Sequence, residues 1–194
     1  MHVLVVVSHP VAGSLTQAVA RRIAADIEAE GHTIELADLA TEGFDPRFGA
    51  TDIAVHTDGA APPPDVLAEQ GRLDRADALV LVYPIYWWSM PALLKGWIDR
   101  VFITGWAYAD GRDGRLEKKL GRLQVHLVAL GGAGLRTYAR RGYFGAMKLQ
   151  IDQGIFDYCG APVKTSELLV PGDTDTPEDH LRRAREIALR VGDP

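Results

Sequence analysis

Residues 78–102 read ALVLVYPIYWWSMPALLKGWIDRVF, and this stretch decides the fold. It opens with an unbroken apolar run, which predicts a strand that is buried on both faces. Pro84 has no N–H to give a neighbouring strand and is expected to end this one. Pro91 suits the first position of a following helix. The stretch therefore predicts a strand, a loop and a helix, the unit from which parallel α/β sheets are built.

The loop between the two prolines carries three consecutive aromatic residues, Tyr86, Trp87 and Trp88. Aromatic clusters more often serve cores and interfaces, and packing under the loop is the simpler interpretation. Open α/β sheets, however, bind their ligands at the carboxyl ends of their strands, where this loop falls. Its position therefore favours rings that stack against a flat ligand.

The alternation of strand and helix continues in both directions along the chain. Strands are predicted at residues 3–7, 33–36, 78–83, 123–130 and 163–170. Helices are predicted at residues 14–31, 65–76, 91–102, 145–158 and 177–191. Residues 40–64 are rich in Gly, Pro, Asp and Ala and are expected to form a long surface excursion. Five strands separated by helices predict an α/β fold with a doubly wound parallel sheet, in one domain spanning residues 1–194.

Composition narrows the class of protein further. The 194 residues are 47% hydrophobic and 24% charged with a net charge of −5, which is ordinary for a globular domain. Without a basic block, no nucleic-acid partner is expected. No apolar stretch approaches the ~20 residues needed to cross a bilayer, so no integral membrane segment is expected. The single cysteine, Cys159, excludes an internal disulfide and favours a reducing compartment, with the cytoplasm as the expected location.

Two further loops are expected at the same sheet edge as the aromatic one. Residues 8–16 lead into a helix N-terminus, whose unpaired N–H groups can donate hydrogen bonds to a phosphate. Ser14 and Thr16 add hydroxyl groups and His9 adds a ring N–H, although Ser14 can equally be a simple helix cap. The third loop contains Gly131 and Gly132, where missing side chains let a ligand approach the main chain.

The three loops together predict a site for a phosphorylated planar heterocycle, and a flavin fits better than a bare nucleotide. The chain lacks a Gly-x-Gly-x-x-Gly fingerprint, a P-loop lysine and metal-ligand spacings, so no metal is expected. Arg136, Arg140 and Arg141 follow the glycine loop. They could meet the phosphate of NADPH, or they could simply be solvated.

At these residues the chain resembles the flavodoxin-like NAD(P)H:quinone oxidoreductases, the group that includes DT-diaphorase and the bacterial ancillary oxidoreductases of potassium-efflux systems. The resemblance covers roughly residues 2–190 and is most specific at residues 84–89 and 91–102. It implies a flavodoxin-like, doubly wound five-stranded sheet of order 2-1-3-4-5. It also implies a non-covalent flavin, FAD or FMN, at the interface of a homodimer. Hydride would pass from NADPH or NADH through the flavin to a quinone or related small-molecule acceptor, with ping-pong kinetics.

The resemblance also implies which residues bind the flavin. Its phosphate tail would contact His9, Ser14, Leu15 and Thr16. The isoalloxazine ring would be held by Pro84, Ile85, Tyr86, Trp87 and Trp88, with Gly131 and Gly132 along its other edge. In the family, a Tyr and a His after the glycines stabilise the reduced flavin. Tyr138 matches that Tyr, but the His position falls on Phe144, so the proton relay is incomplete.

Two other classes of function remain open for such a fold. A flavodoxin-type electron carrier would bind flavin without turnover of its own, but such carriers are usually more acidic. A regulatory subunit of a membrane transporter is the other class, and no residue pattern demands it. Dimerisation is expected independently, because the aromatics at 86–88, 106 and 108 are more than a monomer usually leaves exposed on one edge.

Overall fold

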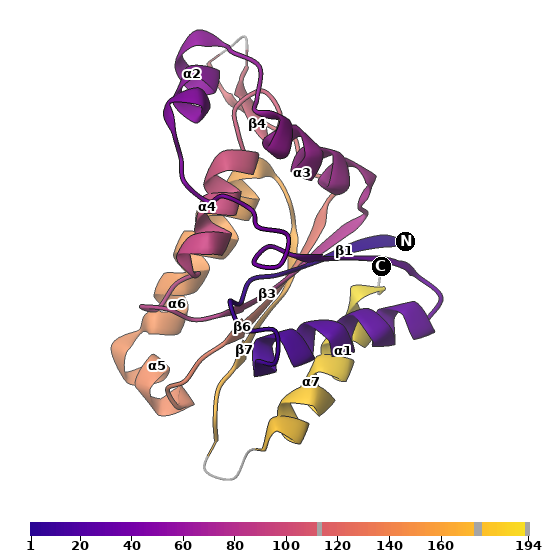
Figure 1. Ribbon diagram of the computed structural model, residues 1–194. Helices are drawn as coiled ribbons and strands as arrows, with labels where there is room; N and C mark the ends of the chain where they lie inside the picture. The colour runs from indigo at the N-terminus through magenta and orange to yellow at the C-terminus, as the bar shows by residue number, and fades with distance from the viewer. Residues whose placement is uncertain (112–113, 173–175, 193–194) are drawn as a thin grey trace.

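The computed structural model describes residues 1–111, 114–172 and 176–192 of the chain. At its centre lies a five-stranded parallel sheet of order β2-β1-β3-β6-β7 (Figure 1). Its strands are β1 (His2–Val7), β2 (Thr33–Asp38), β3 (Ala78–Pro84), β6 (Gln124–Leu130) and β7 (Val163–Leu169). Numbered within the sheet alone, this order is 2-1-3-4-5. The predicted doubly wound sheet is confirmed.

Helices cover both faces of the sheet (Figure 1). One face packs against α1 (Leu15–Ala29) and α7 (Pro177–Val191). The other packs against α3 (Pro64–Arg75), α4 (Ala92–Val101) and η1 (Lys148–Asp157), a π-helix. Alternate residues of the strands enter the two cores. Burial on both faces explains why the central strands β1 and β3 read as unbroken apolar runs.

The predicted helix boundaries hold where local capping sets them. Ser14 Oγ accepts the N–H of Gln17 at 3.3 Å and caps α1. Thr176 and Asp179 form a reciprocal capping box that starts α7. Pro91 differs slightly from expectation, because it is the N-cap of α4 and not its first residue. Pro84 ends β3 as expected and is itself the last residue of the strand, opposite Leu130.

The excursion at residues 40–64 is more ordered than its composition suggests. It contains α2 (Ala50–Asp58), on which Asp52 is 3% exposed. The guanidinium of Arg100, on α4, donates to Asp52 Oδ1 at 2.9 Å and pairs with Asp65. Gly96, also on α4, lies so close to Pro46 that an added Cβ would stand 2.2 Å from its carbonyl oxygen. Contacts with α4, which no local pattern encodes, hold this segment in place.

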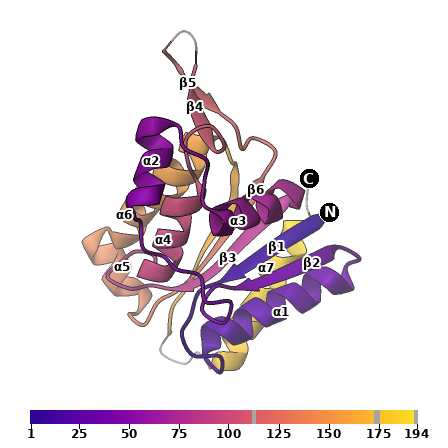
Figure 2. The same cartoon turned by 45° about the horizontal axis from the view of Figure 1, so that its top comes forward.

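Other elements also depart from the predicted boundaries. The helix expected at 145–158 begins earlier, as α6 (Tyr143–Met147), and continues as η1. A short helix that the sequence did not predict, α5 (Leu135–Arg141), precedes it. The hairpin of β4 (Tyr108–Asp110) and β5 (Leu116–Lys118) projects away from the sheet (Figure 2). Within the described residues, no helix combines the length and the apolar character that crossing a membrane requires.

Candidate functional site

The loops that follow β1, β3 and β6 leave the sheet at its carboxyl edge. The first residue of each donates its N–H to the neighbouring strand: Ser8 to Val82 (3.2 Å), Ile85 to Leu130 (2.8 Å) and Gly131 to Leu169 (2.8 Å). These bonds fix where each loop begins. The three loops predicted to share one edge therefore do share it.

The aromatic loop is a tight turn with an unusual backbone. Tyr86 and Ser89 exchange two N–H···O bonds, each 3.1 Å long, so that Trp87 and Trp88 are its two central residues. Both have positive φ angles, 49° and 61°. Turns of this kind normally use Asn and Gly, since bulky residues are strained in the left-handed region. Two tryptophans in these positions indicate a site where function outweighs the cost in backbone strain.

The two indoles have different surroundings. Trp88 stacks on Tyr143, with ring centroids 3.8 Å apart and planes 15° apart, and meets Tyr138 edge-on at 5.3 Å. Trp87, in contrast, is 93% exposed. Ser89 Oγ donates to Gln150 Oε1 at 2.8 Å, which ties the turn to η1. One indole is therefore anchored, and the other is presented to solvent.

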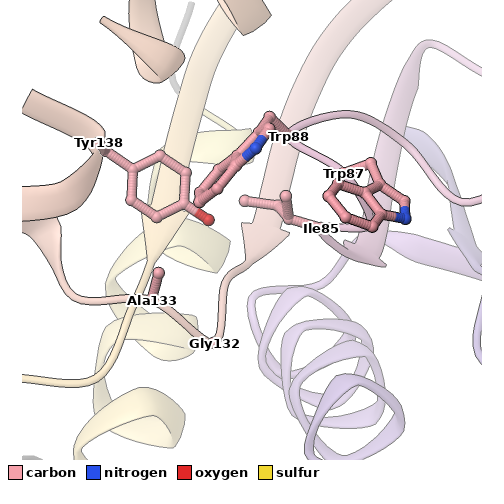
Figure 3. Close-up of a pocket in the computed structure, with 6 residues that line it drawn as sticks. All are labelled: Ile85, Trp87, Trp88, Gly132, Ala133 and Tyr138. Carbon is pink, nitrogen blue, oxygen red and sulfur yellow. The ribbon is translucent and has the colours of Figure 1, made fainter. Parts of the chain in front are cut away.

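A cavity of about 140 Å³ lies between this turn and the glycine loop (Figure 3). Its lining residues are Ile85, Trp87, Trp88, Gly132, Ala133 and Tyr138. The N–H groups of Ile85 and Tyr86 are taken by Leu130 and Ser89. Those of Trp87 and Trp88 bond to nothing in the described part of the chain. The free backbone donors of this loop are therefore the N–H groups of the two tryptophans.

Tyr138, on α5, points its hydroxyl toward this cavity (Figure 3). The residue is 1% exposed, and its hydroxyl makes no hydrogen bond to any residue that the structure describes. Burial raises the pKa of Tyr138, so the hydroxyl stays protonated at neutral pH. A hydroxyl that faces a cavity and bonds to no described residue is free to bond a ligand or water there.

The two glycines of the third loop do different things. A Cβ on Gly131 would stand 2.3 Å from the hydroxyl oxygen of Tyr138, so this glycine makes room for the tyrosine. Gly131 does not line the cavity. Gly132 does, and nothing lies within 4 Å of a Cβ added there. Both glycines were expected to leave the main chain open to a ligand, but only Gly132 does so.

Of the remaining predicted residues, some can face a ligand and others have structural roles. His9 Nδ1 accepts the N–H of Val11 at 3.0 Å, which leaves the other ring nitrogen for a ligand. Ser14 is the helix cap, Thr16 is 3% exposed, and Leu15 packs on the core. Phe144, at the relay position, packs on the core with Lys148 Nζ 5.5 Å from its ring centre. No imidazole stands there.

Some of the expected aromatics lie elsewhere. Trp106 is half-buried against Phe102 and donates to Asp74, near the end of α3 and the amino edge of the sheet. Tyr108 is half-buried on β4 and meets Tyr158 edge-on. The sequence suggested that these two residues share one exposed surface with Trp87. They do not. Among the described residues no group of His, Cys, Asp and Glu could hold a metal ion.

Sequence reasoning missed two residues that shape the site, Tyr143 and Gln150. Both contact the aromatic turn, 55 and 61 positions away along the chain. A pattern confined to neighbouring residues carries no signal for such contacts. They follow only from the position of α6 and η1 beside the turn.

A doubly wound, five-stranded parallel sheet of order 2-1-3-4-5 defines the class of flavodoxin-like α/β proteins. The chain belongs to that family: the family model described as "Flavodoxin-like fold" matches residues 1–190. A Haemophilus influenzae protein named "Uncharacterized NAD(P)H oxidoreductase" is 29% identical over 185 residues, covering 95% of this chain and 90% of the relative.

Two further comparisons point the same way. The rat NAD(P)H dehydrogenase [quinone] 1 is 28% identical over 189 residues, 86% of this chain and 67% of the rat protein. The solved structure of NAD(P)H:quinone oxidoreductase from Methanothermobacter marburgensis is 27% identical. It superposes with a TM-score of 0.85 over 100% of this chain and 97% of that one.

Proposed function

We propose that this protein is a flavin-dependent NAD(P)H oxidoreductase that reduces a quinone or a related small acceptor. The observation that carries the proposal is the cavity between Trp88, Gly132 and Tyr138 at the carboxyl edge of the sheet. Relatives that match this chain along most of its length have names of that activity. The edge location is the usual ligand site of this architecture.

The residues present fit a flavin, FMN or FAD. A bound flavin supplies the two-electron redox chemistry, and the protein orients it. We expect the free N–H groups of Trp87 and Trp88 to donate to the polar edge of the ring. The first N–H groups of α1, with Ser14, Thr16 and His9, are placed to hold the phosphate tail.

Tyr138 holds a proton at the cavity. Because burial raises its pKa, the hydroxyl is a donor over the whole physiological range. Phe144 supplies no second proton carrier, so protons have to reach Tyr138 from solvent. We therefore assign Tyr138 the role of stabilising negative charge that develops on the bound group, without a histidine partner.

We further propose that the protein is a homodimer with the flavin at the interface. A cavity of about 140 Å³ is well below the ~300–1,000 Å³ typical of sites for ligands of this size. Apolar side chains are exposed on two of the three loops and at the start of α5: Val11 58%, Trp87 93% and Leu135 62%. A second copy would complete the site and cover these side chains. The cytoplasm is the proposed location, on the single buried thiol of Cys159.

A visible spectrum of the purified protein tests the proposal. We expect flavin absorption that bleaches when NADPH or NADH is added without oxygen, and recovers on addition of a quinone. Mass analysis of the released chromophore distinguishes FMN from FAD. Bleaching without steady-state turnover would favour an electron carrier. Colourless protein that gains no activity with added FMN or FAD would contradict the proposal.

A further inference from the structure

A second cavity lies farther along the same edge of the sheet. It has a volume of about 340 Å³ and is formed by the start of α5, the end of β7 and α7. Its lining residues are Gly134, Leu135, Arg136, Val170, Pro171, Gly172 and Arg183. Gly134 directly follows Ala133, which lines the first cavity. The two cavities therefore adjoin the same short loop.

Two arginines give this cavity its charge. Arg136 is exposed, and it has neither a hydrogen bond nor an ion pair with any residue that the structure describes. Arg183 Nη2 lies 3.6 Å from Glu167 Oε2, and Arg190 pairs with the same carboxylate at 3.0 Å. One carboxylate thus serves two cations. Among the described residues the cavity keeps an excess of positive charge, with Asp173 and Asp175 lying outside that range.

Positive charge predominates in the segment beside the site, although the chain as a whole has a negative net charge. The net charge is −5, yet residues 131–149 contain Arg136, Arg140, Arg141 and Lys148 and no acidic residue. Of the three arginines on α5, only Arg136 lines the cavity. Segregated charge of this kind draws anions toward a site. Arg136 thus faces the cavity, whereas Arg140 and Arg141 are exposed to solvent and line no part of it.

We propose that this second cavity binds a phosphate group of the nicotinamide dinucleotide, with Arg136 and Arg183 as its donors. The inference rests on the proposed function, which places the flavin ring at the first cavity and so brings the nicotinamide that reduces it to the same edge of the sheet. Adjacent strands are ~4.8 Å apart, so a cavity beside β7 is within reach of a dinucleotide whose ring lies beside β6. Guanidinium groups match phosphate geometry and stay charged at all working pH values. The phosphate is either the 2′-phosphate of NADPH or the pyrophosphate that NADH shares.

Steady-state kinetics of the holoprotein test this assignment. We expect Arg136→Gln and Arg183→Gln each to raise KM about tenfold with little change in kcat, the size expected for loss of one charge-assisted bond. A KM increase for NADPH alone identifies the 2′-phosphate, and an equal increase for NADH identifies the pyrophosphate. Arg140→Gln is the matched control, with the same charge change on the same helix, and should alter KM less than twofold.

Arg136→Gln is the decisive variant, because Arg136 pairs with none of the described residues, so its loss breaks no contact seen in the fold. Calorimetric titration with adenosine 2′,5′-bisphosphate and with ADP gives a second measurement, and at least one should bind more weakly to Arg136→Gln than to wild type. If wild type oxidises NADPH and Arg136→Gln leaves KM for both nucleotides unchanged, the phosphate site is wrong and the oxidoreductase stands. If wild type oxidises neither nucleotide, both proposals fail.

Discussion

At the scale of single residues, Trp87 and Trp88 share a strained backbone but not a role. Both have left-handed φ angles, while only Trp88 packs on other rings. A conformation of this kind costs roughly 1–3 kcal/mol per residue, and surrounding structure has to maintain it. The stack on Tyr143 does so for Trp88. For Trp87 the described residues supply no ring contact that compensates, and the indole is 93% exposed, which points to a ligand or partner.

Substituting each tryptophan by Asn separates the two roles, because Asn tolerates positive φ. Trp87→Asn should leave the free energy of unfolding of the flavin-free protein unchanged, or raise it by ~1 kcal/mol as strain is relieved. Trp88→Asn should lower it by ~3 kcal/mol through lost packing. Urea unfolding measures both values. Titration with flavin should show at least tenfold weaker binding to Trp87→Asn, and equal destabilisation by the two variants would contradict this interpretation.

Replacing Tyr138 should affect the rate of the reaction and leave the stability of the fold nearly unchanged. Because its hydroxyl bonds to no described residue, Tyr138→Phe should change the unfolding free energy by no more than ~0.5 kcal/mol. Loss of a proton donor should lower kcat for quinone reduction about 100-fold, the lower limit of typical acid–base contributions. Stopped-flow measurement with each substrate locates the slow step. An unchanged kcat would remove Tyr138 from catalysis.

At the scale of elements, β6 carries a buried histidine between the two cores. His126 is 0% exposed; its Nδ1 lies 2.9 Å from Thr165 Oγ1 on β7, and its Nε2 has no partner among the described residues. Burial, with a smaller contribution from Lys164, lowers the pKa of His126 to about 4. The native protein therefore keeps this ring neutral well into the acidic range.

This pKa predicts acid destabilisation. The unfolded chain protonates His126 near pH 6.5 whereas the folded protein resists until about 4, so stability falls as pH decreases through that interval. The expected loss is on the order of 3 kcal/mol by pH 4. Urea unfolding at pH 7 and pH 4.5 should show a smaller difference for His126→Gln. Equal pH dependence in the two proteins would contradict the prediction.

Helix α4 is the element that holds the excursion at residues 40–64. Arg100→Gln should destabilise the protein by ~3–5 kcal/mol, because it leaves the buried Asp52 without its cation. Arg47→Gln is the matched control: Arg47 pairs with Asp45 at the surface, and its loss should not shift the unfolding midpoint measurably. Proteolysis within α2 reports whether the segment detaches. Similar midpoints for the two variants would show that the buried pair is not an anchor.

At the scale of the whole molecule, the carboxyl edge of the sheet collects a cavity, exposed apolar side chains and an arginine-lined cavity. A monomer rarely leaves such a surface uncovered. The opposite edge carries the half-buried Trp106 and the β4–β5 hairpin. Ligand binding and assembly are therefore both expected at the carboxyl edge.

Sedimentation of the flavin-loaded protein should give a species of twice the 21.1 kDa chain mass. An isologous interface presents Trp87 twice, so a charged side chain there should act at both copies. Trp87→Glu should shift the equilibrium toward the monomer and weaken flavin binding in parallel. A wild-type monomer that retains flavin would contradict the dimer proposal and leave the monomeric cavity as the complete site.

The sequence by itself determined the five strands of the sheet, the capped ends of α1 and α7, and the three loops that meet at one edge. These features follow from apolar periodicity, caps and proline, which act over a few neighbouring residues. Parallel strands then place their loops together without further information.

Only the tertiary structure decided which side chains in those loops can act. The left-handed turn at Trp87, the stack of Tyr143 on Trp88 and the use of Gly131 as space for Tyr138 all depend on distant contacts. The order of α2 depends on Arg100 in the same way, and Arg136 is distinguished from Arg140 only by the cavity that it lines. Local patterns report burial, whereas a pairing between residues far apart in the chain exists only after the helices have packed.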